Sequence, residues 1–282
     1  MKRLTSKITT LLIIFIMASF TSKAQQFTPN TEIGLLLGGS YYLGDLNKVH
    51  FYQPLPTAGL IIRKNSDKRF VYKAEVMYIN LRSDERESND AIANNRGLHF
   101  RSPVYEVSGQ LEFNFLPYQP GNPLYTWTPF IYTGVSLFGF NPQAENSAGE
   151  WVDLQELGTE GQGSVEFKDR KSYSLIQFSI PMGGGVKIAV NESFSIILEY
   201  SARKTFTDYL DDVSTTFVGD RTINGDYPTN MSNTPWSVEM SDPEGTHVNG
   251  DQRGNPDKKD WYSFAGITLS FKLKNNTKGC DY

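Results

Sequence analysis

The sequence predicts an all-β protein, an eight-stranded antiparallel transmembrane β-barrel with long extracellular loops and short periplasmic turns. Three observations support this prediction. Large apolar side chains alternate with small or polar ones at period two in four long segments, and weaker versions of the pattern occur in four more. The connections between these segments are alternately short and long. The charged residues of the segments fall on the face that carries the small side chains.

The eight expected strands follow from the alternation. At residues 33–44 the odd positions are mostly large and apolar, whereas most even positions are small. Residues 104–115, 194–203 and 262–273 divide in the same way into an apolar face and a polar or small face. Weaker alternation marks four further strands at residues 57–64, 70–81, 130–140 and 173–188. Eight is the smallest usual number of strands in a closed membrane barrel.

The lengths of the connections orient the barrel. Those at residues 65–68, 119–126 and 190–193 are short or modest, and the first, at 45–54, is intermediate. The long connections lie at residues 82–99, 142–171 and 205–260. Because outer-membrane barrels combine short periplasmic turns with long outer loops, we expect both termini in the periplasm. The barrel is then expected to occupy residues 25–273, followed by a periplasmic tail at 274–282.

The position of the charges separates this prediction from a soluble antiparallel barrel or sandwich, in which the apolar face points inward to a core. A soluble barrel carries lysine and glutamate on its outer face. Here the charged strand residues share the face of the small residues, and they are Arg63, Lys73, Glu75, Glu106, Glu112, Lys187, Glu199 and Arg203. We therefore expect a lumen polar network that fills the interior and blocks solute flow, consisting of Lys73, Glu75, Glu106, Glu112, Glu199 and Arg203.

Residues 1–24 are expected to be a secretory signal peptide. Basic residues precede an apolar run at residues 11–20, and the small residues Ser22 and Ala24 provide a cleavage site. Cleavage after Ala24 removes four of the 27 basic residues. The remaining 23 basic residues face 31 acidic ones, which gives a mature charge of −8.

Composition excludes several other classes. The chain has 282 residues, 39% apolar and 21% charged, with a mean hydropathy of −0.40. Beyond the N-terminus no stretch reaches the roughly 18 to 20 apolar residues of a membrane-spanning helix. The acidic balance argues against a nucleic-acid-binding protein. A single cysteine excludes an internal disulfide framework and a cysteine-based zinc site.

Aromatic residues and glycines also have expected places. Trp127, Trp261, Tyr125 and Tyr262 lie near predicted strand ends and suit an interfacial aromatic girdle. The three glycines at 183–185 are followed by no helix pattern, which argues against a phosphate-binding loop. They are expected to permit tight curvature or the close approach of a side chain across the lumen.

Several segments carry a family resemblance. They are residues 38–45 (GGSYYLGD), 95–102 (NRGLHFRS) with Glu106, 112–115 (EFNF), 157–163 (LGTEGQG) and 203–214 (RKTFTDYLDDVS). In this order the chain resembles the PorG family of Bacteroidetes outer-membrane proteins. The resemblance implies an OmpA-like barrel of the type IX secretion system, without enzymatic activity, that anchors the periplasmic ring of the lipoprotein PorK and PorN. The alternative is a small porin or ligand-binding barrel of OmpA or OmpW type.

Candidates for chemistry are few, and we expect neither an enzyme nor a cofactor. The densest carboxylate cluster, Asp208, Asp211 and Asp212, has oxygen ligands suited to calcium but lacks the spacing of an EF-hand. A structural role, in which these acids accept hydrogen bonds where the seventh strand ends, is favoured. Glu160, between glycines, is expected in a turn.

One local grouping, His99 with Ser102 and Glu106, contains the residue types of a serine hydrolase. On a strand His99 and Ser102 face opposite sides, which argues against a catalytic pair unless a bulge intervenes.

Cys280, in the expected periplasmic tail, is the one cysteine of the chain. An unpaired cysteine in an exported protein suggests an intermolecular disulfide or a free thiol. We hypothesise that Cys280 contacts the PorK-like lipoprotein, against the alternative of an inert thiol.

Overall fold

The computed structural model describes residues 27, 29–88, 90–219, 228 and 235–273. The expected signal peptide at 1–24 and the tail at 274–282, which includes Cys280, lie outside the described residues.

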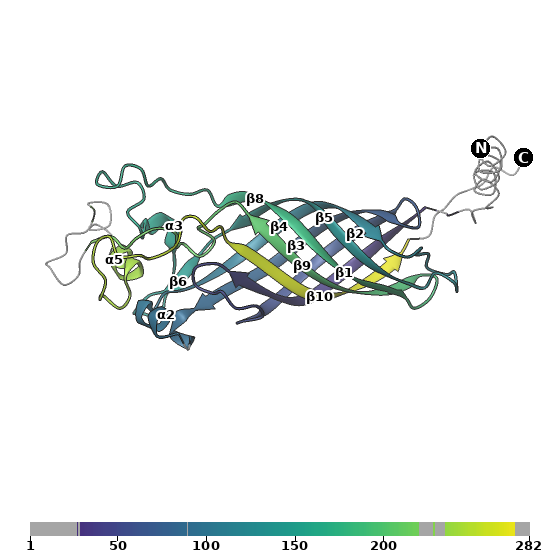
Figure 1. The fold of residues 1–282 in the computed structure, drawn as a ribbon, viewed down its shortest axis with the longest axis horizontal. Coiled ribbons are helices and arrows are strands. Elements are labelled where there is room, and N and C mark those ends of the chain that lie inside the picture. The colour runs from purple at the N-terminus through teal and green to yellow at the C-terminus, as the bar shows by residue number, and fades with distance from the viewer. Residues whose placement is uncertain (1–26, 28, 89, 220–227, 229–234, 274–282) are drawn as a thin grey trace, which may run out of the picture.

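Eight long antiparallel strands close into a barrel, as predicted (Figure 1). They are β1 (Asn30–Leu43), β2 (Leu55–Asn65), β3 (Phe70–Asp84), β4 (His99–Asn114), β5 (Trp127–Phe140), β8 (Ile176–Ala189), β9 (Phe194–Thr205) and β10 (Trp261–Lys272). Each pairs with its neighbour along the chain, and β1 pairs with β10 from Glu32↔Lys272 to Leu43↔Trp261. This last pairing leaves no free edge in the ring, which satisfies the backbone hydrogen bonds without help from solvent.

Two of the strands run further toward the long loops than the alternation of apolar residues predicts. β3 continues to Asp84 and β4 begins at His99, and the register pairs Arg82 with Arg101 in this extension. The outward side chains there are charged, so that the apolar signal ends before the backbone ladder does. The β3–β4 part of the barrel wall therefore extends toward the long loops beyond the apolar section.

The long connections all lie at the end of the barrel opposite the strand ends Asn30 and Lys272 (Figure 1). They contain the hairpin β6 (Gln143–Glu145) and β7 (Trp151–Asp153), which is joined to β4 through Arg101↔Gln143. They also hold η1 (Glu85–Glu87), α2 (Ala91–Arg96), α3 (Leu154–Leu157) and α5 (Pro235–Ser241). None of the helices in the described ranges is both long and apolar enough to cross a bilayer.

The glycine run in β8 allows a close approach inside the barrel. A Cβ built on Gly183 would lie 2.7 Å from the Tyr132 hydroxyl oxygen, and one on Gly185 would lie 1.9 Å from the Leu198 carbonyl oxygen. Any larger residue at Gly183 would therefore displace the Tyr132 ring. Tyr132 is the register partner of Gly183 on the neighbouring strand β5, so this close approach is between adjacent strands and not across the lumen.

Candidate functional site

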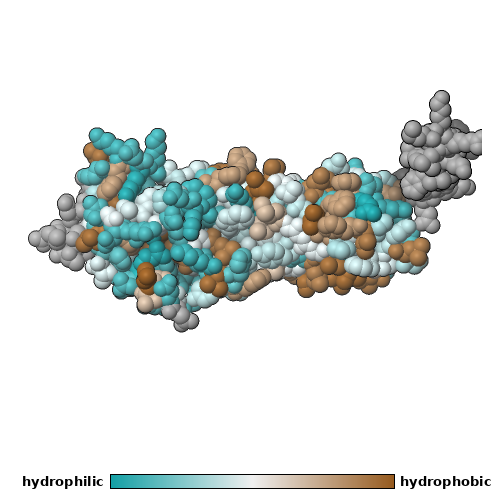
Figure 2. Space-filling view, in the orientation of Figure 1, coloured by the Kyte–Doolittle hydropathy of each residue, from teal (hydrophilic) through white to brown (hydrophobic). Residues whose placement is uncertain are grey.

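The exterior of the barrel is apolar between two belts of aromatic side chains, one near each end. The outward side chains of the strands include Ile33, Leu35, Leu60 and Val107, each more than 40% exposed. In Figure 2 hydrophobic residues gather over the half of the barrel in which β10 ends, whereas the loop end is mostly hydrophilic. In a membrane this exposed surface meets lipid, and the same surface in water would be an unusually large apolar patch.

The aromatic belts lie at the two ends of this apolar section. At the short-turn end Phe70 packs against Phe113 with ring centroids 5.3 Å apart. Trp127, the first residue of β5, is exposed at the same end. Phe194 and Phe271 form a second pair at the same end, at 5.0 Å.

Toward the loops Tyr78 packs against Tyr105 at 5.2 Å, and the hydroxyls of Tyr41 and Tyr200 are 2.8 Å apart. The prediction for Tyr262 is wrong, because its side chain is fully buried and points into the lumen. Its position in the inward register of β10 overrides its closeness to a strand end.

Inside the barrel eight charged side chains form one continuous series of ion pairs. At one end Lys187 Nζ lies 2.5 Å from Glu112 Oε2, and Arg63 Nε donates to Glu112 Oε1 at 2.9 Å. Arg63 Nη2 then lies 3.6 Å from Glu199 Oε1. The next cation, Lys73, has its Nζ 3.0 Å from Glu199 Oε2.

The series continues from Lys73 toward the loop end. Lys73 Nζ lies 2.6 Å from Glu75 Oε2, and Arg203 Nη2 lies 3.0 Å from both Glu75 Oε1 and Glu106 Oε1. Tyr262 completes it by donating a hydrogen bond of 2.5 Å to Glu106 Oε2. All six residues of the predicted lumen network thus lie together, with Arg63 and Lys187 as further members.

Cations and carboxylates alternate four with four in this network, and each side chain is at most 1% exposed. The two end members, Lys187 and Glu106, each have one ionic partner, so that removing Glu112 or Arg203 leaves an uncompensated charge in a buried site. The network therefore fills the lumen as a fixed core.

The mouth at the short-turn end is closed as well. Tyr118, from the turn between β4 and β5, is buried and donates to Ser195 Oγ at 2.8 Å. Beside it Glu32 accepts hydrogen bonds from Asn65 Nδ2 at 2.7 Å and from Ser270 Oγ at 2.8 Å. The carboxylate of Glu32 is thus satisfied by neutral donors.

At the other mouth the long loops fold into a cap with a core of its own. Leu98, Leu154, Leu210 and Met240 are buried in one cluster with strand residues such as Phe138. The polar centre of the cap is Arg253, which is buried and has its Nη1 3.0 Å from Glu160 Oε1 and 2.6 Å from the Asp212 carbonyl oxygen.

Glu160 has a larger role than its expected place in a turn. Its neighbour Gly161 has a left-handed φ of 78°, in agreement with the turn. The carboxylate itself is fully buried, and accepts hydrogen bonds from the backbone N–H groups of Ser214 at 2.9 Å and Thr215 at 3.1 Å. Glu160 and Arg253 therefore tie together three segments of the cap that are distant in sequence.

The three clustered aspartates do not point toward a common centre. Asp208 accepts from Ser214 Oγ at 2.6 Å, and Asp211 from the hydroxyl of Tyr42 at 2.5 Å. Asp212 accepts from the hydroxyls of Thr159 and Tyr173. Within the described residues no group of three or more His, Cys, Asp or Glu side chains has an arrangement suited to a metal ion.

These carboxyls are strongly affected by burial. Burial raises the pKa of Asp208 to about 7 and that of Asp212 to about 6. Asp211 and Asp260 flank the same phenol, since Tyr42 Oη is 2.5 Å from one and 2.9 Å from the other. Burial raises the pKa of each of these two carboxyls well above its usual range, and the charge of Asp260 adds to this effect at Asp211, as does that of Asp208 at Asp260.

The hydrolase-like grouping is not assembled. His99 Nε2 accepts from the Glu145 N–H at 3.1 Å, and Ser102 Oγ accepts from the Asn141 N–H at 3.2 Å. Glu106 is committed to Arg203 in the lumen. Both His99 and Ser102 are buried, although the alternation predicts opposite faces, because the His99 ring lies against the backbone of Glu145 in the β6–β7 hairpin.

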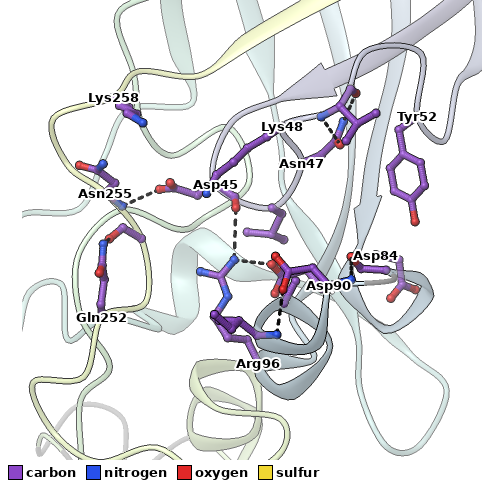
Figure 3. A pocket seen from close by; sticks show the side chains of 17 residues that line it. Asp45, Asn47, Lys48, Tyr52, Asp84, Asp90, Arg96, Gln252, Asn255 and Lys258 are labelled. Atoms are coloured by element: carbon purple, nitrogen blue, oxygen red, sulfur yellow. Dashed lines mark hydrogen bonds and ion pairs between the residues drawn. The ribbon is translucent and has the colours of Figure 1, made fainter.

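A polar cavity of about 680 Å³ lies between the cap segments (Figure 3). Arg96 is directed toward the carbonyl oxygen of Asp45 at 3.2 Å and pairs with the buried carboxylate of Glu85. On the other wall the backbone N–H of Asn255 donates to Asp45 Oδ2 at 2.7 Å. Arg96, Glu85 and Asp45 therefore have partners within the cavity wall, and their contacts join three loops.

A family model for a domain of unknown function, DUF6089, matches residues 6–236. The chain belongs to the DUF6089 family. The match extends over β1 to β9 and ends before β10.

The solved structures with similar folds share little sequence identity with this DUF6089 protein. The N-terminal β-barrel domain of Pseudomonas aeruginosa OprF is 10% identical, with a TM-score of 0.38, and 87% of this chain and 100% of that chain are covered. Neisserial surface protein A is 8% identical, with a TM-score of 0.42 and coverage of 88% and 100%. OprG from P. aeruginosa is 10% identical, with a TM-score of 0.36 and coverage of 86% and 95%. A search of curated proteins gave no significant match.

Proposed function

We propose that this DUF6089 protein is a non-conducting, non-enzymatic barrel of the outer membrane that anchors the periplasmic PorK/PorN ring of the type IX secretion system. The observation that carries the structural part of this proposal is the lumen network. A conducting pore needs a continuous water-filled path. Here eight charges are paired along the lumen and Tyr118 closes one mouth.

The membrane location is supported by the closed barrel and its apolar exterior. In a bilayer every backbone polar group of a spanning segment needs a partner, and the ring of strand pairs provides it. The orientation follows from the connections, since short turns lie with the strand ends at Asn30 and Lys272, and long loops lie at the opposite end. We infer that the short turns and both termini are periplasmic.

The anchoring role is supported by the PorG-like segments of the sequence. One of them, residues 203–214, forms the end of β9 and the centre of the cap, where Asp208, Asp211 and Asp212 are buried. The family resemblance thus includes residues that stabilise this fold. On this proposal the partner docks at the periplasmic end, where Cys280 follows the last strand in sequence.

Two measurements on the full chain test the proposal. Purification from its native membranes in a mild detergent should recover the lipoprotein PorK together with PorN, and planar-bilayer recordings should show no conductance. Recovery of the barrel alone, together with steady conductance, would favour the alternative of a small OmpA- or OmpW-type porin.

The hypothesis for Cys280 is tested separately. Non-reducing gels of membranes should show a higher-mass adduct of the parent protein that disappears in a Cys280→Ser strain. Identical migration of the two proteins would count against a covalent link while leaving the anchoring role to the purification experiment.

A further inference from the structure

The outer wall of the barrel carries an apolar groove that the proposed anchoring role does not use. Its volume is about 700 Å³, and its lining comes from β2, β3, β4 and β5. Ala74 and Gly109 form its floor, since they are paired in register and both point outward. Apart from the chain neighbours of Gly109, no described heavy atom lies within 4 Å of the position where its Cβ would stand.

Large side chains surround this floor. Ile62 and Val135 continue the row of Ala74 and Gly109 on either side, and both are more than 50% exposed. The adjacent row toward the short turns carries the large side chains of Tyr72 and Leu111. The groove is therefore a depression bounded by ridges.

The groove lies within the membrane-facing section of the wall. On β3, Ala74 lies between Phe70 and Tyr78, which belong to the aromatic belts at the short-turn end and the loop end. At this level the surrounding solvent is hydrocarbon, so an occupant must be largely apolar.

A cation stands at one end of the groove. Lys64 is outward-facing and exposed, and it pairs in register with Tyr72 on the side of the short turns. A lysine near a bilayer interface extends its ammonium group to the headgroup level while its methylene groups remain along the apolar surface. Apolar floor and terminal cation together match a phosphate-bearing lipid.

We propose that this groove binds one phospholipid of the leaflet at the short-turn end, with an acyl chain over Ala74 and Gly109 and its phosphate at Lys64. A second copy of the chain fits less well. A two-fold contact through this face brings the Lys64 side chains of both copies to the same small interface, where like charges repel.

Native mass spectrometry of the full chain in mild detergent, with phosphatidylglycerol added, tests the proposal. The parent should retain one lipid, and Gly109→Leu should lose it, because the new side chain fills the open floor. Ala74→Leu is a second filling variant. Gly39→Leu is the matched control, since Gly39 also points outward on β1 and its Cβ would meet nothing closer than 3.8 Å.

The headgroup contact is tested with Lys64→Gln, which should weaken retention about fivefold, the effect of one lysine at an anionic lipid surface. Lys204→Gln, at the loop end of β9, should leave retention unchanged. Heat-modifiable migration on gels verifies that each variant is folded.

Three results would overturn the proposal. The first is equal lipid retention by the Gly109→Leu and Gly39→Leu variants. The second is equal retention of diacylglycerol, which lacks the phosphate. The third is a dimer of the parent that Gly109→Leu disrupts, which would assign the groove to a second copy.

Discussion

Glu112 is the most informative position at which to perturb the lumen. It is paired with Lys187 at 2.5 Å and with Arg63 at 2.9 Å, and all three side chains are at most 1% exposed. At an effective dielectric constant of about 20, each contact is worth at most about 7 kcal/mol of attraction. Glu112→Gln removes both attractions, but it also removes the cost of burying the carboxylate, which is several kcal/mol. The expected net loss is about 3–5 kcal/mol of unfolding free energy, the range for breaking a buried pair.

The loss falls mainly on Lys187, because Arg63 retains Glu199 as a neighbour at 3.6 Å. The double variant Glu112→Gln/Lys187→Met should therefore recover part of the loss. Urea unfolding of the refolded barrel in detergent, followed by tryptophan fluorescence, gives the free energies of the parent, both single variants and the double variant. A cost for Glu112→Gln below about 1 kcal/mol, the range of exposed pairs, would show that water reaches the lumen and would refute the closed core.

Further predictions concern the cap and its carboxyls. Arg253→Met should leave Glu160 and Asp212 without their cation. Limited proteolysis of the loops in folded protein should then become faster, while the urea midpoint of the barrel is unchanged. Equal protease resistance of the parent and the variant would contradict the central role of Arg253. Burial raises the folded-state pKa values of Asp208, Asp212 and Glu85 to about 7, 6 and 7, so their contribution to cap stability is complete below about pH 4 and declines as pH rises to about 7. Protection of the loops from proteolysis should therefore be greater at pH 5 than at pH 8, with an unfolded substrate at each pH as the control. A reversed order would be inconsistent with these shifts. Calorimetric titration with calcium should give no saturable heat, whereas saturable heat that is lost in an Asp211→Asn/Asp212→Asn variant would establish a cation site.

The barrel could be predicted because its period-two signal is local. Membrane-facing and lumen-facing residues alternate along each strand, so Ile33 and Leu35 identify a face without knowledge of any partner. The charged lumen residues could be placed for the same reason, since Lys73 and Glu75 occupy one face of β3.

The cap could not be predicted in this way. Arg253 lies in a polar loop without periodicity, and its partner Glu160 is 93 residues away in sequence. The β6–β7 hairpin has strands of three residues, too short for alternation to be read. Closeness to a strand end does not predict the inward position of Tyr262, because the face of a strand residue is set by register alone.

The lumen network also bears on how the barrel is assembled. Apart from Lys73 and Glu75 on β3, its pairs join residues far apart in sequence, with Arg63 and Glu112 separated by 49 residues, Arg203 and Glu106 by 97, and Lys73 and Glu199 by 126. A half-formed sheet therefore presents single charges to hydrocarbon, and their cost is removed only when distant strands meet. Partly inserted hairpins are accordingly unstable, so that closure and insertion must occur together. The same charges that immobilise the finished interior thus make the stability of each strand depend on closure of the whole ring.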